Sequence, residues 1–366
     1  MRVLLVSGSY PPMHCGVGDY TARLAQALAQ RGDIEVSIIT TRGDPQSDAE
    51  TAREVSRVMP DWRVRRLGAL LSAARAARPD LLHLQFPGQG YNAITGPILV
   101  PCLSRTILGI PVVVTLHEYM PRNLKSQLAR FPMIWCAAEI IVVRPDYVSR
   151  IPVPTAWFVR GKKIRFVPNA SVIPPANLNA EEREAVRRPL GCGPRTLVAY
   201  FGFAYPHKGM EQLFSIADPG RHHLLLICEL SSENAYHTRL LELANSSEWK
   251  DHITITGFVN SDHAAKLLAA ADAVVFPFRD GGGEWNTSLH AAVLQGSFVI
   301  TTSRDRNGYD PEHNVYYAKL NDVQEMRSAL NGHAGTRREH STDIVGGEWH
   351  EIAVQHRSLY EALLSK

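Results

Sequence analysis

Residues 273–301 read AVVFPFRDGGGEWNTSLHAAVLQGSFVIT and contain a strand, a turn, a helix and a second strand. The first apolar run leads into three glycines at 281–283, which allow the backbone to turn tightly. Asn286 or Thr287 then suits the N-cap of a helix, and a second apolar run closes the segment. Short apolar strands joined by a crossover helix are typical of a parallel α/β sheet.

The same alternation of apolar runs and amphipathic segments continues along nearly the whole chain. Its clearest helix is predicted over 19–32, where apolar residues recur at helical spacing until Gly32. Residues 168–194, rich in proline and glycine, interrupt the pattern as an interdomain connection does. The sequence therefore predicts two tandem α/β halves with doubly wound sheets. The expected strands are 3–7, 35–40, 80–84, 112–116, 139–143 and 164–167, then 196–201, 223–228, 253–256, 273–276 and 297–301.

Composition and charge limit the function. A chain of 366 residues with 45% hydrophobic and 20% charged residues predicts a soluble protein of two domains. A net charge of +3 is too mild for a nucleic-acid reader, although it is compatible with contact to an anionic membrane surface. Prolines interrupt the most apolar window, so no membrane span is expected, and the N-terminal apolar run is too short for a signal peptide.

The cysteines indicate the compartment. They are odd in number, widely spread and without a CxxC motif, so neither a disulfide framework nor a zinc site is expected. We therefore expect a reducing, cytoplasmic environment. The five cysteines are Cys15, Cys102, Cys136, Cys192 and Cys228.

In the first half, candidate ligand-binding residues follow predicted strands. Gly16 and Gly18 come just before a predicted helix, where backbone N–H groups can meet a phosphate or a sugar, although a plain turn is an equal alternative. His117 directly follows strand 112–116 and could donate to a sugar hydroxyl, although a structural role is the more common one for such a histidine. For His83 and Gln85 a structural role is likewise favoured.

In the second half, two segments predict an anion site. Strand 196–201 ends at Gly202, and Lys208 is expected in the first turn of the next helix, where its ammonium and the helix dipole both favour an anion. The glycine turn at 281–283 and the helix N-terminus at Asn286 form a second cradle on the same sheet edge. A diphosphate between the two cradles is the economical interpretation.

Across essentially its full length, the chain resembles the GT-B glycosyltransferases of the retaining family 4 type. The resemblance implies two facing Rossmann-like domains, at 1–175 for the acceptor and at 190–345 for the nucleotide-sugar. It also implies a final helix, 346–366, that crosses back to the N-terminal domain. The matching segments are PPMHCGVGDYTARLAQALAQRG, LHLQFPGQGY, VVVTLHEY, RFVPNAS, FGFAYPHKGMEQLF, ITGFVNSDHAAKLLAAADAVVFPF, TSLHAAVLQGSFVITT and EWHEIAVQHRSLYEALL.

The resemblance also assigns roles. It implies a metal-independent hexosyltransferase without a cofactor, moving sugar from a nucleoside diphosphate, UDP favoured over GDP, to a glycan or lipid-linked acceptor. Such enzymes act in polysaccharide or glycoconjugate biosynthesis, and peripheral contact with the inner membrane face is compatible with them. No nucleic-acid partner is expected. The implied catalytic residues are Lys208, His117 and Glu284; the implied donor-site residues are Gly16, Gly18, Gly202, Lys208, Gly257, Phe258, Val259, Arg279, Gly282, Gly283, Asn286, Thr287 and Ser288.

The sequence departs from the family in its acidic residues. Family members usually carry two glutamates separated by seven residues in this region. Alignment on Gly296 places them at Gly283 and Ala291, so both are absent here, while Glu284 lies one position late and His290 lies beside the second position.

A second departure is Phe203, which stands where the family usually has an Arg. Three interpretations stay open. Glu284 can serve near the sugar after a one-residue shift, Arg279 can replace the missing Arg, or the chain binds a sugar nucleotide without turning it over.

Two other functions compete with glycosyl transfer. A GT-B-fold epimerase would act on a sugar nucleotide without an acceptor, and a non-catalytic partner would bind the nucleotide only. A dinucleotide dehydrogenase is disfavoured, because neither half has a tight three-glycine turn followed by an acid about 20 residues later.

Overall fold

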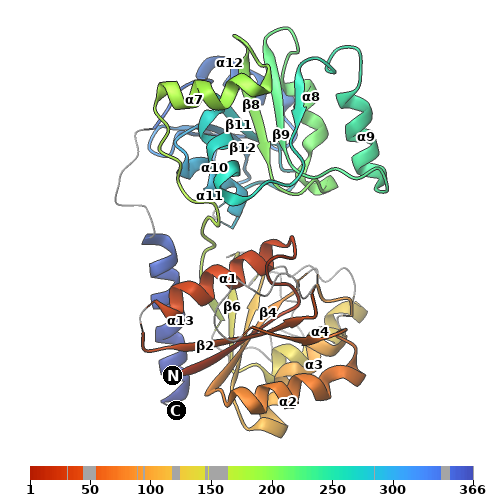
Figure 1. The fold of residues 1–366 in the computed structure, drawn as a ribbon, viewed down its shortest axis with the longest axis vertical. Helices are drawn as coiled ribbons and strands as arrows, with labels where there is room; N and C mark the ends of the chain where they lie inside the picture. Colours follow the sequence, from red (N-terminus) through yellow and green to blue (C-terminus); the bar gives the residue numbers. More distant parts are fainter. Residues whose placement is uncertain are drawn as a thin grey trace. The chain divides into compact units, whose positions relative to one another are not determined.

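The computed structural model divides into two compact units, shown as a ribbon in Figure 1. The first unit comprises Met1–Asn169 together with Gly346–Lys366, and the second comprises Ala170–Val345. The residues described are 1–30, 32–43, 55–88, 90–93, 95–117, 124–144, 147, 164–283, 285–338 and 347–365.

The first unit is built on a seven-stranded parallel sheet in the order β3-β2-β1-β4-β5-β6-β7. Its strands are short and mostly buried on both faces, as strands covered by helices on both sides must be. They are β1 (Arg2–Ser7), β2 (Glu35–Thr41), β3 (Val55–Met59), β4 (Leu81–Phe86), β5 (Val112–Leu116), β6 (Glu139–Val142) and β7 (Ile164–Phe166).

Alternate residues of these strands enter two different cores. Leu4, Leu82 and Val114 belong to a core that also holds Leu70 of α2 and Met133 of α4. The opposite face is covered by other helices, so the sheet is doubly wound. The helices of the unit are α1 (Gly16–Ala29), η2 (Val64–Arg66), α2 (Leu67–Ala77), α3 (Thr95–Leu103), the π-helical η3 (Ser104–Leu108), α4 (Leu124–Cys136) and α13 (Gly347–Leu364).

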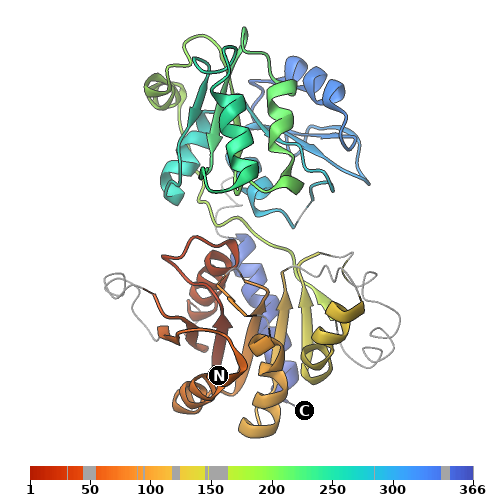
Figure 2. The same cartoon turned by 90° about the vertical axis from the view of Figure 1, so that its right-hand side faces the viewer.

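The last helix, α13, belongs to the first unit and packs against α1, the helix that follows the first strand. Figure 1 shows the two helices side by side, and Figure 2 shows α13 behind the sheet. The buried face of α13 includes Ile352, Ala353, His356, Leu359 and Tyr360. The resemblance to the family implied this return of the C-terminal helix.

The second unit repeats the architecture with the strand order β10-β9-β8-β11-β12-β14-β13. All pairs are parallel except β13 with β14. The strands are β8 (Thr196–Phe201), β9 (His222–Ile227), β10 (Ile253–Ile255), β11 (Ala273–Phe276), β12 (Phe298–Thr302), β13 (Gly308–Asp310) and β14 (Val315–Ala318). The helices are α7 (Ala180–Arg187), η4 (Arg188–Leu190), η5 (Pro206–Lys208), η6 (Met210–Gln212), α8 (Leu213–Ile216), α9 (Ala235–Ala244), α10 (Ser261–Ala270), α11 (Thr287–Leu294) and α12 (Val323–His333).

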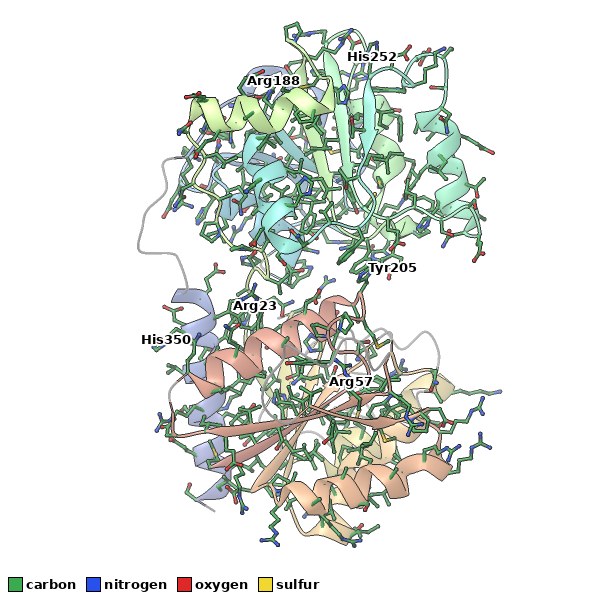
Figure 3. The ribbon with its side chains drawn as sticks, viewed as in Figure 1. Arg23, Arg57, Arg188, Tyr205, His252 and His350 are labelled. Carbon is green, nitrogen blue, oxygen red and sulfur yellow. A yellow bond between two sulfur atoms is a disulfide. The ribbon has the colours of Figure 1, made fainter. Side chains whose placement is uncertain are left out.

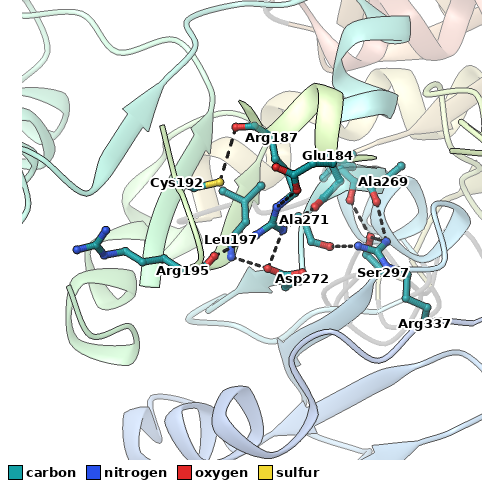
Figure 4. A network of polar contacts seen from close by, with 12 residues as sticks. Glu184, Arg187, Cys192, Arg195, Leu197, Ala269, Ala271, Asp272, Ser297 and Arg337 are labelled. Atoms are coloured by element: carbon teal, nitrogen blue, oxygen red, sulfur yellow. Dashed lines mark hydrogen bonds and ion pairs between the residues drawn. The ribbon is translucent and has the colours of Figure 1, made fainter. Parts of the chain in front are cut away.

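A polar network fixes the amino ends of this second sheet (Figure 4). Asp272, just before β11, accepts hydrogen bonds from Arg187 at 2.8 Å and from the Leu197 N–H at 2.7 Å. Arg337 donates to the carbonyl of Ala271 at 2.7 Å. These bonds lie at the edge opposite the ligand edge of a parallel sheet, so we assign them to stability.

Most predicted strands are confirmed, but three strands and one disulfide were missed. β3, β13 and β14 are the missed strands. A disulfide joins Cys102 of α3 to Cys136 of α4, with 5.0 Å between their Cα atoms, whereas the spacing of the cysteines predicted none. The expectation was wrong because the pair is brought together by two helices that pack 34 residues apart in sequence. Cys15, Cys192 and Cys228 are buried free thiols.

In the part of the chain that the structure describes, no helix is long and apolar enough to cross a membrane.

Candidate active site

The second sheet changes direction between β8 and β11, because β9 and β10 extend it on one side and β12 on the other. Such a topological switch point is where open α/β sheets bind ligands, beyond the carboxyl ends of the strands. The loop after β8 carries Gly202 and Lys208, and the loop after β11 carries Arg279 and the glycine turn. Both sequence-predicted cradles therefore lie at this point.

Lys208 ends a short 3-10 turn and does not begin a helix, which corrects the sequence-based expectation. Gly209 follows it with φ +66°, a left-handed conformation that breaks the helical path. A Cβ at Gly209 would lie 2.2 Å from the Pro277 carbonyl, so the two loops touch here. The Lys208 ammonium lies 4.4 Å from the centroid of the Phe278 ring, a cation–π contact. The same ring borders the glycine turn, since a Cβ at Gly282 would lie 3.0 Å from it.

The glycine turn is held by hydrogen bonds that its backbone N–H groups donate to neighbouring residues. The Gly282 N–H donates to the Thr302 carbonyl at 2.7 Å, and a Cβ at Gly282 would lie 2.4 Å from Thr301 Oγ1. The Gly283 N–H donates to Asn286 Oδ1 at 3.0 Å. Only glycine can pass this close to the end of β12.

Asn286 is the N-cap of α11, as predicted, but its side chain makes no hydrogen bond to the helix. Its carboxamide oxygen faces the turn and accepts from Gly283. The first turn of α11, with Thr287 and Ser288, therefore receives no side-chain cap, which keeps its N–H groups available to an anion. Gly202 fits beside it, since a Cβ there would lie 2.7 Å from Ser288 Oγ.

Arg279 is bound to a carboxylate that the sequence analysis did not single out. Its guanidinium forms an ion pair with Glu211 and donates to the Pro206 carbonyl at 3.2 Å. Tyr236 donates its hydroxyl to the same carboxylate at 2.5 Å. Burial of Glu211 raises its pKa, but the hydrogen bonds from Tyr236 and Arg279 outweigh burial and lower it, so Glu211 is ionised at neutral pH.

The remaining second-half candidates follow β10 or lie in the glycine turn. Gly257 has φ +71°, Phe258 is exposed, and Val259 packs partly against the core. Ala291, at the position of the family's second acid, is fully buried in the core. Glu284 lies outside the described residues, so its role stays a prediction.

In the first unit, Gly16 and Gly18 lie inside the first turn of α1 and not in a loop before it, which corrects the expectation. The helix starts earlier because Cys15 is already its extended N-cap residue. A Cβ at Gly18 would lie 3.1 Å from the Ser9 backbone, so this glycine lets α1 pack closely. Nothing lies within 4 Å of a Cβ at Gly16.

His117 follows β5 at the carboxyl edge, as expected. Its Nε2 lies 2.8 Å from Gln85 Oε1, at the end of β4, and its ring makes an edge-to-face contact with Tyr20 at 4.7 Å. Burial lowers the pKa of His117 to about 3, so the ring is neutral. Because Gln85 offers an oxygen, His117 Nε2 carries the proton and Nδ1 is the acceptor.

His83 has the structural role that the sequence favoured. Both of its ring nitrogens are used within the core, by Tyr360 and by Thr115.

Sequence reasoning missed Glu211 and Tyr236. They lie on η6 and α9, 25 residues apart, and no motif connects them with Arg279. Only the packing of α9 against η6 brings them to the loop.

Known proteins resemble this chain in sequence over part of its length and in fold over all of it. Residues 15–170 match the model of the glycosyl transferase 4-like domain. A 2-deoxystreptamine N-acetyl-D-glucosaminyltransferase of Streptomyces fradiae is 25% identical over 266 residues, which are 68% of this chain and 61% of that protein. The chain spans 46% and 61% of the two curated relatives that it matches.

Solved structures resemble the whole chain. Sucrose-phosphate synthase from Thermosynechococcus elongatus aligns with a TM-score of 0.74 at 17% identity, covering 100% of this chain and 99% of the other. Anabaena HepE (Alr3699), solved with UDP and glucose, aligns with a TM-score of 0.72 at 15% identity over 100% of both chains. Residues 15–170 thus match a glycosyl transferase 4-like domain, and the chain has the GT-B fold that the resemblance implied.

Proposed function

We propose that the chain is a retaining, metal-independent glycosyltransferase that moves a hexose from a nucleoside-diphosphate sugar to a glycan or lipid-linked acceptor. The observation that carries the proposal is the convergence of Lys208 and the glycine turn at the switch point of the second sheet. One cation beside a glycine turn and a helix N-terminus without a side-chain cap suits a diphosphate.

The chemistry follows from charge. Breaking a glycosyl–phosphate bond leaves negative charge on the departing diphosphate. Lys208 and the uncapped N–H groups at the start of α11 would stabilise that charge, and because they are held in place beforehand, little reorganisation is needed.

A UDP-sugar is the favoured donor. Among proteins with this fold, Anabaena HepE was solved with UDP and glucose and also with UDP-glucose. In this chain the base would lie beside the backbone of Gly257 to Val259. His117, neutral and with Nδ1 free of the Gln85 contact, would meet the transferred sugar or the acceptor.

Direct assay tests the proposal. Thermal-shift screening with UDP-, GDP-, ADP- and TDP-sugars should show stabilisation by the true donor, because a ligand that binds the folded state raises its stability. Release of the nucleoside diphosphate with an acceptor panel should follow, and the anomeric configuration of the product reports retention. Stabilisation by none of these nucleotides would refute the proposal.

A non-catalytic sugar-nucleotide-binding partner is the second candidate. It is favoured by the absence of acids at Gly283 and at the buried Ala291. Glu284→Gln separates the two functions. In a transferase that uses Glu284 near the sugar, this change lowers turnover while UDP affinity stays constant. Tight UDP binding by the wild type with no turnover across donors and acceptors would favour the binding partner.

A further inference from the structure

Three rings stack in a row on the loop after β8. The Phe203 and Tyr205 ring centroids lie 6.0 Å apart with 29° between the planes, and those of Tyr205 and His207 lie 5.6 Å apart with 14°. We call these three residues the aromatic platform. Figure 3 shows Tyr205 at the edge of the second unit, with Arg188 and His252 at the opposite edge.

The backbone under the platform is fixed. The Tyr200 hydroxyl, from buried β8, donates to the Phe203 carbonyl at 3.0 Å, and the Tyr205 N–H donates to the same oxygen at 3.2 Å. His237 of α9 donates through Nε2 to the carbonyl of Ala204 at 2.9 Å, and Ala204 is itself buried. A loop with so many hydrogen bonds holds its side chains in a defined arrangement.

Phe203 nevertheless stays 41% exposed, although a phenyl ring at the end of a buried strand could fold into the core. The ring stacks on Tyr205 and is still open to solvent. An exposed apolar surface on a rigid loop beside a candidate site indicates a ligand contact.

The position of the aromatic platform indicates which part of a sugar nucleotide or acceptor it contacts. Phe203 directly follows Gly202, which contacts Ser288, and it precedes Lys208 on the same loop. A phenyl ring offers no charge to a phosphate. The nucleobase is expected beyond β10, which lies two strands from β8, about 10 Å at the usual strand spacing. The ligand part left for this position is a sugar ring, whose C–H face is apolar and flat.

We propose that the aromatic platform is a stacking surface for a pyranose ring, with Phe203 as the contacting residue. The proposal rests on the function proposed above and adds a specificity-determining residue to it. Two sources share this chemistry: the hexose of the donor, and a saccharide of the acceptor.

Calorimetry on the full chain distinguishes the sources. UDP, UDP-glucose, UDP-galactose and UDP-N-acetylglucosamine are titrated into the wild type, Phe203→Ala and Phe203→Trp. Glucose, galactose, mannose and maltotriose are then titrated into the UDP-loaded proteins. Phe166→Ala is the matched control, because Phe166 is 39% exposed and lies on β7 of the other unit.

We expect UDP to bind all four proteins equally. If the donor hexose stacks on Phe203, Phe203→Ala weakens the best UDP-sugar about tenfold, the effect of losing one stacking contact, and Phe203→Trp retains it. If the acceptor stacks there, the UDP-sugars bind unchanged and saccharide binding to the UDP-loaded protein falls by a similar factor.

Failure of the proposed function and failure of the platform proposal give different results. A wild type that does not bind UDP refutes the proposed function and this inference with it. A wild type that binds UDP, with Phe203→Ala indistinguishable from Phe166→Ala for every UDP-sugar and saccharide, refutes the platform alone. Thermal melting of each variant verifies folding.

Discussion

His83 Nδ1 and the Tyr360 hydroxyl oxygen lie 2.6 Å apart in the core of the first unit, although 277 residues separate them in the chain. The other ring nitrogen of His83 lies 2.7 Å from Thr115 Oγ1. Strand β4, strand β5 and helix α13 are therefore joined by one imidazole. Since burial lowers the pKa of His83 well below its usual value, the ring is neutral and one of its nitrogens must accept.

Removing the hydroxyl should destabilise the first unit. Tyr360→Phe leaves a buried His83 nitrogen without its partner, so we expect the free energy of unfolding to fall by about 1–3 kcal/mol. Urea denaturation measures the change. Val354→Ala, an exposed position on the same helix, is the control and should stay within about 0.5 kcal/mol. Equal stability of the two variants would mean that the hydrogen bond does not hold α13.

The buried histidines should make stability depend on pH. Burial lowers the pKa of His356 to about 4 and that of His117 to about 3. Between these values and about pH 6.5 the unfolded chain binds protons that the folded chain does not, so stability falls as the pH decreases. Each histidine contributes a slope of about 1.4 kcal/mol per pH unit in that window.

His356→Leu should remove one such contribution. Unfolding free energies of the wild type and the variant, measured from pH 6.5 to pH 4.5, should differ in slope by about 1.4 kcal/mol per pH unit. Parallel curves would show that His356 is protonated in the folded protein.

Loss of the Lys208 ammonium should impair the transfer step. We expect Lys208→Ala to reduce turnover about 100-fold, since one contact to developing charge is commonly worth about 3 kcal/mol. Steady-state assays with the donor found by screening measure the effect. Lys266→Ala, at an exposed position of α10, should leave turnover unchanged. Near-normal activity of Lys208→Ala would exclude its contact with the diphosphate.

The ion pair of Arg279 with Glu211 should compete with nucleotide binding. Glu211→Gln removes the competing charge, so UDP affinity should rise several-fold, whereas Arg279→Ala should lower it by about 1.5–3 kcal/mol. Calorimetric titration of UDP compares the two variants with the wild type. Three identical curves would show that Arg279 serves Glu211 alone and that the loop backbone and Lys208 hold the diphosphate.

Chelation should leave activity intact. Within the described residues, no group of three or more His, Cys, Asp or Glu side chains could hold a metal ion. Assays with and without EDTA measure the difference. Complete loss, restored by Mg²⁺ or Mn²⁺, would contradict the proposed stabilisation of the leaving group by Lys208 and backbone N–H groups.

The architecture could be predicted because buried parallel strands are marked by continuous apolar runs, such as 112–116 and 273–276. Two of the three missed strands lack that mark, whereas β14 (Val315–Ala318) is apolar and mostly buried and was missed in spite of it. β3 carries Arg57 at its centre and is only half buried, and β13 (Gly308–Asp310) is a three-residue edge strand. Edge strands face solvent on one side, so their sequences resemble loops.

The site was predicted less completely. Strand ends and glycines gave the positions of Lys208 and the turn at 281–283, since both follow from local sequence. The left-handed Gly209 that ends the Lys208 turn, and the capture of Arg279 by Glu211, depend on packing between distant segments. The spacing of residues along the chain does not predict such contacts.

The return of α13 to the first unit determines when that unit can be completed during synthesis. All of Ala170–Val345 leaves the ribosome before Tyr360 does. Until then α1 and His83 lack the helix that covers them, while every strand of the second unit is already available to pair. The N-terminal half therefore begins folding first and finishes last. Premature termination before α13 (Gly347–Leu364) should yield a chain with a folded second unit and an exposed, aggregation-prone face on the first.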